Sequence, residues 1–599
     1  MDSTRRTLVT PLLYLRLPIF LTEIAVTVVS TFHAFSSADE VSSCNLTVFR
    51  ITIVLEWFLI LTAAIGIIIV FHLRESDVED NTLIAQRSWS RRMRIFKIGQ
   101  NESMRAALDE VALLISSFFV DSDLVFSDVL AGLLLAYHSP NNQYPPVKEK
   151  EYASSRPDWM NIEEAEYYLH HASCVYGWPT YLLYNFRPKS IWNLYKQLQC
   201  CGSMRCEETV NWEEIEMREE RRNINRRKEK VEEYEIDKNA GILLYKGKSM
   251  VVEDNCCYCN TAAVVLANQD RNCDLVYMSF RNRVYEVPFA VIVDHDKKSI
   301  IVTIRGSCSL IDLVTDLCLA DEIMTVDVDQ DATLREDSEL DKRGDVRVHR
   351  GMLRSARFIF ETLEKQNILK NTFVVNPSYQ LVVCGHSLGA GVGSLLTMLL
   401  KQEYPTIRCY AFAPPGCVIS EFGQDEMEKY VMSVVAGDDI VSRMSFQTLH
   451  KLRQSIFTEL VACKRAKYKI LIRGVYQLFF EYPWQDEGLS GVSPADMEAA
   501  LLQQNRVYGG TESSEQQQQS IPEVPQRIQL YVPGRIVYLS ESPENGTQEQ
   551  WIDPKCLSAI KLSVSVLSDH MPAAVQRFMK NRIQSSSRGE IEIVTSQPV

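Results

Sequence analysis

Several features are scarce in this sequence, and their scarcity narrows the classes of protein that it can encode. Cysteine is sparse, at 16 of 599 residues, and pairs such as Cys200–Cys201 and Cys256–Cys257 lack zinc-finger spacing. We therefore expect mostly reduced thiols in a cytosolic domain rather than a disulfide scaffold. Basic residues are not in excess: the formal net charge is −14, which disfavours nucleic-acid binding. No internal repeat is evident.

Two long apolar segments lie near the N-terminus, at 17–35 and 49–73. The second is long enough to cross a hydrocarbon core of about 30 Å at about 1.5 Å per residue. The first is the weaker candidate, because it contains Pro18 and Glu23. No small-residue cleavage site follows it, which disfavours a signal peptide. The sequence therefore predicts a transmembrane helical hairpin, with buried core helices as the alternative.

The charges around these segments predict their orientation. The connecting loop contains Asp39 and Glu40 but no Lys or Arg. Basic residues lie outside the pair, namely Arg5, Arg6 and Arg16 before it and Arg74, Arg87, Arg91, Arg92, Arg94 and Lys97 after it. The positive-inside rule then places both ends in the cytoplasm. Within the segments, Glu23 and Glu56 are expected to face each other or a partner helix rather than to form a functional site.

From about Val284 onwards, short apolar runs alternate with helical segments. "SIIVTIRG", "YQLVVCG", "IRCYAFAPP" and "YVMSVVAGDD" are typical of buried strands, and "SLIDLVTDL" and "AGVGSLLTMLLKQEY" are typical of helices. Such alternation predicts a mostly parallel sheet flanked by helices. Further predictions are a helical region at 104–138, a strand pair around Pro533–Gly534 and a helix after His570.

These patterns divide the chain into four parts. They are a transmembrane region (1–75), a cytosolic linker with helical or cap segments (76–240), an α/β domain (241–585) with an insertion at about 445–528, and a polar tail (586–599). The insertion contains a Gln-rich run that is typical of disorder.

A possible nucleophile lies in "LVVCGHSLGAGVG". Ser387 stands between Gly385 and Gly389 after an apolar run, which fits the G-x-S-x-G nucleophile elbow. At such an elbow the backbone of the serine is strained, and the residues two positions away must be small so that strand and helix can approach. The hydroxyl is then exposed at a helix N-terminus, where backbone N–H groups can stabilise an oxyanion.

A serine nucleophile needs a base and an acid, which follow it along the chain in the order acid, then histidine. Only His450 and His570 lie after Ser387 with room for an acid between. We favour His570, because "LSDHMP" is typical of a loop, whereas His450 lies in a predicted helix. Asp438 and Asp439 both end a predicted strand, and the residues alone barely separate them.

An oxyanion needs two donors. We expect one to be the backbone N–H of Leu388 and the other Ser307, which follows the strand "IVTIRG" and offers both an N–H and a hydroxyl. The alternative role for Ser307, a helix N-cap, is compatible with this one.

Together, "VTIRGSCSLIDLVTDL", "VVCGHSLGAGVGSLLTMLL", "CYAFAPPG", "SVVAGDDIVSRMS" and "LSDHMP" resemble the sn-1-specific diacylglycerol lipases of the class 3 (fungal-type) lipase superfamily, with the beta type the most similar. The resemblance also includes "VYGWP" and "VYEVPFAVIVDH". It implies an α/β-hydrolase fold, with Ser387 as nucleophile, Asp439 as orienting acid and His570 as base. The two predicted spans resemble the last two of the four in this family, and Ser307 stands where relatives often have threonine.

The resemblance further implies a multi-pass protein of the plasma membrane, with a cytosolic catalytic domain. The substrate would be diacylglycerol from the inner leaflet, and the product a 2-monoacylglycerol such as the endocannabinoid 2-arachidonoylglycerol. The mechanism requires no cofactor; the family is reported to be stimulated by calcium, although no calcium-loop pattern is present. The alternatives are a phospholipase A1 or another acylglycerol lipase with the same triad, and a non-catalytic membrane scaffold.

Overall fold

The computed structural model describes most of the predicted catalytic domain and short parts of the rest. It covers residues 22–31, 50–61, 105, 126–139, 142–143, 148–150, 152, 155–184, 188–197, 210–211, 248–255, 257–307, 321–324, 346–463, 465–479, 528–542 and 546–595. The chain forms two compact units. The smaller comprises Met1–Asn81, Phe119–Ser139 and Ser455–Glu512, and the larger comprises Thr82–Phe118, Pro140–Gln454 and Ser513–Val599.

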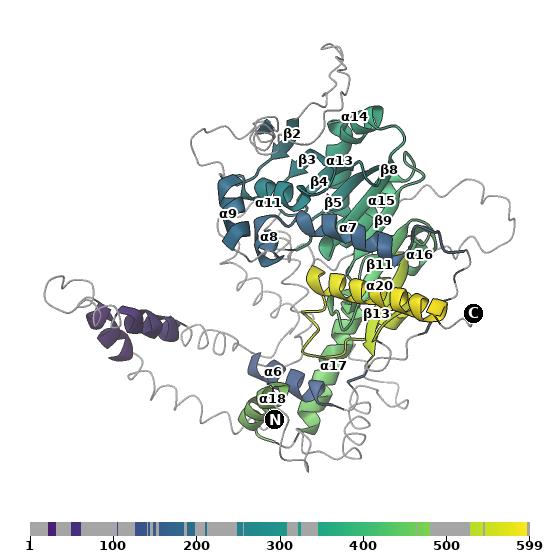
Figure 1. Ribbon diagram of the computed structural model, residues 1–599. Coiled ribbons are helices and arrows are strands. Elements are labelled where there is room, and N and C mark those ends of the chain that lie inside the picture. Colours follow the sequence, from purple (N-terminus) through teal and green to yellow (C-terminus); the bar gives the residue numbers. More distant parts are fainter. Residues whose placement is uncertain are drawn as a thin grey trace, which may run out of the picture. The chain divides into compact units, whose positions relative to one another are not determined.

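A ten-stranded sheet forms the centre of the larger unit (Figure 1). Its order is β1 (Val210–Asn211), β2 (Lys248–Val252), β3 (Cys273–Ser279), β4 (Phe289–Asp294), β5 (Ser299–Ile304), β8 (Gln380–His386), β9 (Arg408–Phe412), β11 (Val431–Ala436), β13 (Arg535–Ser542) and β14 (Gly546–Ile552). Strands β4, β5 and β11 are buried along their whole length, as expected for strands covered on both faces.

The sheet is mixed, which corrects the prediction of a mostly parallel one. The run from β5 through β8, β9 and β11 to β13 is parallel, but β3–β4–β5 and β13–β14 are antiparallel. The reason is the length of the connections. Only four residues separate Asp294 from Ser299, and so short a link returns the chain antiparallel, whereas parallel neighbours need a long crossover. The alternation of strands and helices in the sequence therefore predicted the strand directions correctly only at the centre of the sheet.

Helices cover both faces of this sheet (Figure 1). One face packs against α7 (Ile162–Cys174), α11 (Cys259–Asn268) and α20 (Pro572–Thr595), and the other against α13 (Arg350–Lys365), α14 (Ile368–Val375) and α15 (Leu388–Leu400). Successive side chains of β8 alternate between them: Leu381 and Val383 join the α13–α15 core, and Val382 and Cys384 join the α7–α20 core. The result is the three-layer core of an α/β hydrolase.

A second, four-stranded sheet has the order β12 (Leu530–Tyr531), β10 (Ile419–Ser420), β7 (Arg347–His349) and β6 (Asp321–Ile323). Strands β12 and β13 lie on either side of Pro533–Gly534, but they do not pair with each other. Strand β12 pairs with β10, and β13 pairs with β11 and β14. The predicted strand pair was therefore right about the strands and wrong about their partners. The remaining elements of this unit include α8 (Trp178–Tyr184), α9 (Pro188–Gln197), α16 (Glu421–Met427) and the 3₁₀ turns at Val441–Arg443 and Pro554–Leu557.

The smaller unit contains α6 (Phe126–Tyr137), α18 (Lys467–Phe479) and the C-terminal part of α17 (Phe446–Ala462). Buried Asp128 on α6 accepts a bond of 2.8 Å from Lys467 on α18. Two helices therefore lie within the predicted insertion. Residues 480–527 of the insertion, and the predicted helix at "SLIDLVTDL", lie outside the described residues.

Of the two predicted spans, the structure describes residues 22–31 and 50–61, and both stretches are helical. Thr27 Oγ1 lies 3.3 Å from Glu56 Oε2, and Trp57 Nε1 donates to Thr31 Oγ1 at 2.9 Å, so the two stretches share polar contacts. Glu56 thus pairs with a threonine of the other helix rather than with Glu23. Within the described ranges, no helix combines the length and the apolarity needed to cross a bilayer. The flanks of both predicted spans lie outside these ranges.

Candidate active site

Ser387 occupies a sharp turn between β8 and α15. Its backbone has φ 58° and ψ −129°, a conformation that costs a non-glycine residue of the order of 1–3 kcal/mol. The turn is held because the N–H of Ser387 donates to the carbonyl of Phe412 on β9 at 2.9 Å. Such a turn places a side chain at the N-terminus of the following helix, as expected for a nucleophile elbow.

The two flanking glycines are required by close backbone approach. A Cβ at Gly385 would lie 2.3 Å from the carbonyl oxygen of Gly389. A Cβ at Gly389 would lie 2.2 Å from the carbonyl oxygen of Ile304 on β5. Neither backbone could move without separating the helix from the sheet. The prediction that these positions must lack bulk is confirmed.

His570 lies between Ser387 and Asp439. Its Nε2 is 2.9 Å from Ser387 Oγ, and its Nδ1 is 3.0 Å from Asp439 Oδ1. Since a carboxylate only accepts hydrogen bonds, Nδ1 carries the proton and Nε2 is the acceptor for the hydroxyl of Ser387. Three side chains that are far apart in sequence therefore form one continuous chain of hydrogen bonds.

Asp439, at the C-terminal end of β11, is fully buried and has several donors around it. Its Oδ1 also accepts from the N–H of Val441 at 2.8 Å, and its Oδ2 accepts from Ser442 Oγ at 2.9 Å. Burial raises the pKa of this carboxyl, but the electrostatic interaction and hydrogen bond with the His570 ring, together with these hydrogen bonds, outweigh burial and hold the pKa below its ordinary value. An ionised carboxylate is thus maintained behind the imidazole.

The structure also separates the candidates that the sequence left open. Asp438 is only half-buried, and its carboxylate faces Ser565 and Lys561, at 3.4 and 4.0 Å, rather than His570. His450 lies in α17, where its ring stacks on Phe446.

A second histidine, His386, was missed by the sequence analysis. It is buried directly before Ser387, and its Nε2 lies 2.7 Å from the backbone carbonyl oxygen of His570. A carbonyl only accepts, so Nε2 carries the proton and Nδ1 accepts from the Tyr176 hydroxyl at 2.8 Å. Burial and the nearby His570 lower the pKa of His386 to about 3, which keeps the ring neutral. No sequence signal links Tyr176 to residues 210 positions away.

The predicted oxyanion donors lie around the same turn. Leu388 is the first residue of α15, where a backbone N–H has no partner within the helix. Ser307 follows Gly306, and a Cβ built on Gly306 would lie 3.1 Å from Ser387 Cβ. The loop after β5 therefore packs directly beside the serine.

These features define the class of protein. An α/β sheet carries a strained serine between a strand and a helix, with a histidine and a buried carboxylate in line behind it, and residues 301–449 match the family profile described as "Lipase (class 3)". The chain is an ester hydrolase of the lipase class.

Its relatives extend beyond that domain. Residues 1–71 match the profile "Diacylglycerol lipase N-terminal transmembrane region". The chain is 28% identical to diacylglycerol lipase-beta of Mus musculus over 618 aligned positions, which cover 95% of this chain and 82% of that protein. It is 26% identical to diacylglycerol lipase-alpha of Homo sapiens over 98% of this chain, but spans only 56% of that protein's length.

The chain is thus homologous to the diacylglycerol lipases over most of its length, including residues 1–71, which match the profile of their N-terminal region. A solved structure of a Rhizomucor miehei lipase with its propeptide has 16% identity and a TM-score of 0.27, covering 51% of this chain and 74% of that one. A lipase of Rhizopus microsporus var. chinensis has 20% identity and a TM-score of 0.24, covering 30% and 57%. The assignment rests on the sequence relatives and on the geometry of the site.

Proposed function

We propose that this protein hydrolyses the sn-1 ester of diacylglycerol at Ser387, releasing a fatty acid and a 2-monoacylglycerol such as 2-arachidonoylglycerol. The observation that carries the proposal is the hydrogen-bonded line from Ser387 through His570 to Asp439. The substrate class is supported by the relatives, which are named as diacylglycerol lipases.

In the first half of the reaction, the Oγ of Ser387 attacks the ester carbonyl while Nε2 of His570 takes its proton. Asp439 holds the imidazole in the tautomer that this step needs and stabilises the imidazolium that forms. His570 then gives the proton to the departing monoacylglycerol oxygen. In the second half, His570 activates a water molecule that hydrolyses the acyl-enzyme and restores Ser387.

The tetrahedral intermediate carries a negative charge that needs fixed donors. We assign these to the N–H of Leu388, at the positive end of the α15 dipole, and to Ser307, through its N–H and hydroxyl. Two observations support this assignment: Leu388 directly follows the nucleophile, and the loop that contains Ser307 packs against Ser387.

Diacylglycerol is almost insoluble in water, so the enzyme must take it from a membrane. We propose that the N-terminal region anchors the protein in the plasma membrane and that the catalytic domain works on the inner leaflet from the cytosol. Exposed apolar side chains on α8 and α9 support work at a lipid surface: Trp178, Leu183, Ile191, Trp192 and Tyr195. Aromatic rings of this kind are favoured at membrane interfaces. Helix α8 begins two residues after Tyr176, which contacts His386 beside the serine.

None of these steps requires a metal or an organic cofactor. Stimulation by calcium remains a proposal that comes from the family resemblance alone. Activity measured in calcium and in a calcium chelator tests it, and equal rates would remove it.

Labelling with a fluorophosphonate probe and lipid hydrolysis together test the proposal. Wild-type protein should react with the probe at Ser387, whereas Ser387→Ala should not react and should lose diacylglycerol hydrolysis. If the folded wild-type protein does not react with the probe, a non-catalytic scaffold is favoured. Faster hydrolysis of phosphatidylcholine than of diacylglycerol would favour a phospholipase A1, and release of the sn-2 acyl chain would contradict the sn-1 assignment.

The lipid-surface role of α9 has its own test. Trp192→Ser should slow hydrolysis of diacylglycerol in vesicles and leave hydrolysis of a short, water-soluble ester unchanged. Val374→Ser is a matched control, because Val374 is also an exposed apolar residue but lies on α14. An equal loss on both substrates would show that Trp192 does not act through the membrane.

A further inference from the structure

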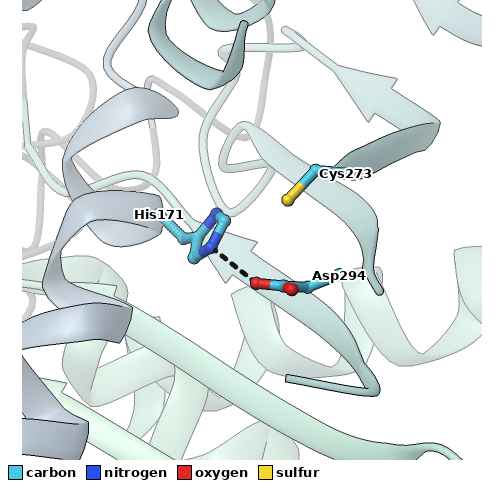
Figure 2. A group of neighbouring side chains, drawn as sticks. All are labelled: His171, Cys273 and Asp294. Atoms are coloured by element: carbon cyan, nitrogen blue, oxygen red, sulfur yellow. Dashed lines mark ion pairs between the residues drawn. The ribbon is translucent and has the colours of Figure 1, made fainter. Parts of the chain in front are cut away.

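A group of buried and half-buried side chains on the α7 face of the sheet has no role in ester hydrolysis. Cys273 and Asp294 are opposite each other in the antiparallel pairing of β3 with β4, and His171 approaches them from α7. Figure 2 shows these three side chains pointing into one space from three different elements. One ligand atom from each lies within 4.8 Å of the others.

His171 is the unusual member of this group. It is fully buried, and among the described residues no group reaches either ring nitrogen with good hydrogen-bond geometry. Its Nε2 faces Asp294 Oδ2 at 3.4 Å, a contact of ion-pair length between two side chains that are both fully buried. Leaving buried polar nitrogens unpaired costs free energy, so a histidine in this state indicates a missing partner.

We propose that His171, Cys273 and Asp294 bind a divalent cation of the zinc type, which fastens α7 to the β3–β4 hairpin. Nitrogen, thiolate sulfur and carboxylate oxygen are the donors that zinc accepts, at bond lengths of about 2.0–2.3 Å. Two ligands of a tetrahedral ion with such bonds lie about 3.3–3.8 Å apart, so the spacing of His171 and Asp294 already fits. All three ligand atoms lie within 4.8 Å of one another, so an approach of at most about 1 Å by the half-buried Cys273 would complete this spacing.

The surroundings of the group orient its ligands. The Tyr167 hydroxyl donates to Asp294 Oδ2 at 2.5 Å, and the N–H groups of Asp296 and Lys297 donate to Asp294 Oδ1 at 2.9 and 3.0 Å. The carbonyl of His171 accepts from Thr303 Oγ1 at 3.0 Å, which fixes this part of α7 against β5. Outer contacts of this kind are typical of metal sites.

Charge and donor type also select the ion. A thiolate at Cys273 and the carboxylate of Asp294 balance the two charges of the cation, so the filled site is neutral. That matters because two cations stand nearby: Arg271 and Lys297 lie over the Tyr167 ring, at 4.4 and 5.0 Å from its centroid. Calcium prefers six to eight oxygen ligands, and this group offers one carboxylate, so it is not a calcium site.

The inference does not depend on the proposed function, because all three residues are separate from the Ser387 site. Its test is metal binding by the full-length protein in detergent, with Co²⁺ as a spectroscopic probe and Zn²⁺ as the competitor. Wild type should bind one Co²⁺ with a thiolate-to-cobalt absorption band that Zn²⁺ abolishes, and Zn²⁺ should raise its unfolding temperature.

Three variants sharpen this test. Cys273→Ser should lose the band and the thermal shift, whereas Cys556→Ser, which changes another half-buried thiol, should keep both. Tyr167→Phe keeps the three ligands and should weaken binding by about 10–100-fold. Equal binding by wild type and Cys273→Ser would overturn the proposal, as would an equal loss in Cys556→Ser.

A measurement on the wild type covers the case in which Cys273→Ser does not fold. Zn²⁺ should slow alkylation of Cys273 by a maleimide at least tenfold relative to Cys556, as mapped by mass spectrometry, and Ca²⁺ should not. The same alkylation rate of Cys273 with and without Zn²⁺ would refute the site.

Discussion

The bridge from Tyr176 through His386 to the backbone of His570 yields the sharpest prediction. His386→Leu keeps a similar volume but removes both hydrogen bonds, of 2.8 and 2.7 Å. Each buried polar group left without its partner costs about 1–3 kcal/mol. Only the part of this cost that displaces the His570 imidazole affects the reaction.

If the full cost of one unsatisfied group appears as displacement of the His570 imidazole, the activation free energy rises by about 1–3 kcal/mol. This corresponds to a decrease in kcat of about 5–150-fold. Tyr176→Phe leaves the bond from His386 to the His570 carbonyl intact. It should therefore cost only about 0.5–1.5 kcal/mol, or about 2–12-fold. The double variant should lose less than the product of the two single effects, because the residues act in one network.

The assay is hydrolysis of a soluble ester, with kcat and KM determined separately, together with the rate of fluorophosphonate labelling of Ser387. We expect kcat and the labelling rate to fall while KM stays constant. His349→Leu is the matched control. His349 is also buried, and its Nδ1 accepts a hydrogen bond from the N–H of Met352 that the leucine would remove, but this bond caps α13 and does not contact His570. If His386→Leu lowers only the unfolding temperature, as His349→Leu should, the bridge does not position His570.

Three further predictions follow from the same geometry. Asp439→Asn should lower kcat by about 10⁴-fold, as in other Ser-His-Asp triads, whereas Asp438→Asn should stay within a few-fold of wild type in the same assay; equal losses would contradict the assignment. Gly389→Ala should unfold the domain or abolish activity, because its Cβ meets a carbonyl at 2.2 Å, whereas Gly393→Ala, whose Cβ meets a valine methyl at 3.2 Å, should retain both in thermal melts and rate measurements. Acid should destabilise the fold through His386, whose pKa is about 3 in the folded state and about 6.5 in the unfolded state. Between these pH values the unfolded state binds one more proton than the folded state. The free energy of unfolding should therefore fall by about 1.4 kcal/mol per pH unit from pH 6.5 towards 3. Burial also lowers the pKa of His170, so denaturant titrations at pH 7.5 and 5.5 should show a smaller, but not zero, pH dependence in His386→Leu than in wild type; identical slopes would refute this account.

Much of the fold could be predicted where the determining interactions are local. The strands β5, β8, β9 and β11 and the helix α15 lie within about four residues of the expected segments, because apolar periodicity sets which face of each element is buried. The antiparallel edges were missed, since the direction of a strand depends on its connection and not on its own composition. About half of the residues in the two predicted spans are described, and these are helical. Residues 1–71 also match a transmembrane-region profile.

The candidate site, too, was predictable from sequence in part and depended on tertiary contacts for the rest. The order of residues along the chain narrowed the base to His450 and His570, and the loop-like sequence around His570 favoured it over His450. The spacing of Gly385, Ser387 and Gly389 was enough to predict a strained turn. Their catalytic roles stay predictions until the variants are measured. No sequence signal pointed to the Tyr176–His386 bridge.

The sequence by itself determined the sharp turn at Ser387, because the two small neighbours and the following helix are steric requirements contained in five consecutive residues. Only the tertiary structure decided between Asp438 and Asp439, which are adjacent in the chain and chemically identical. The choice depends on which carboxylate contacts the imidazole of His570, 131 residues after Asp439. Folding alone also brings His171, Cys273 and Asp294 together, because strand pairing and helix packing set distances that no local pattern encodes.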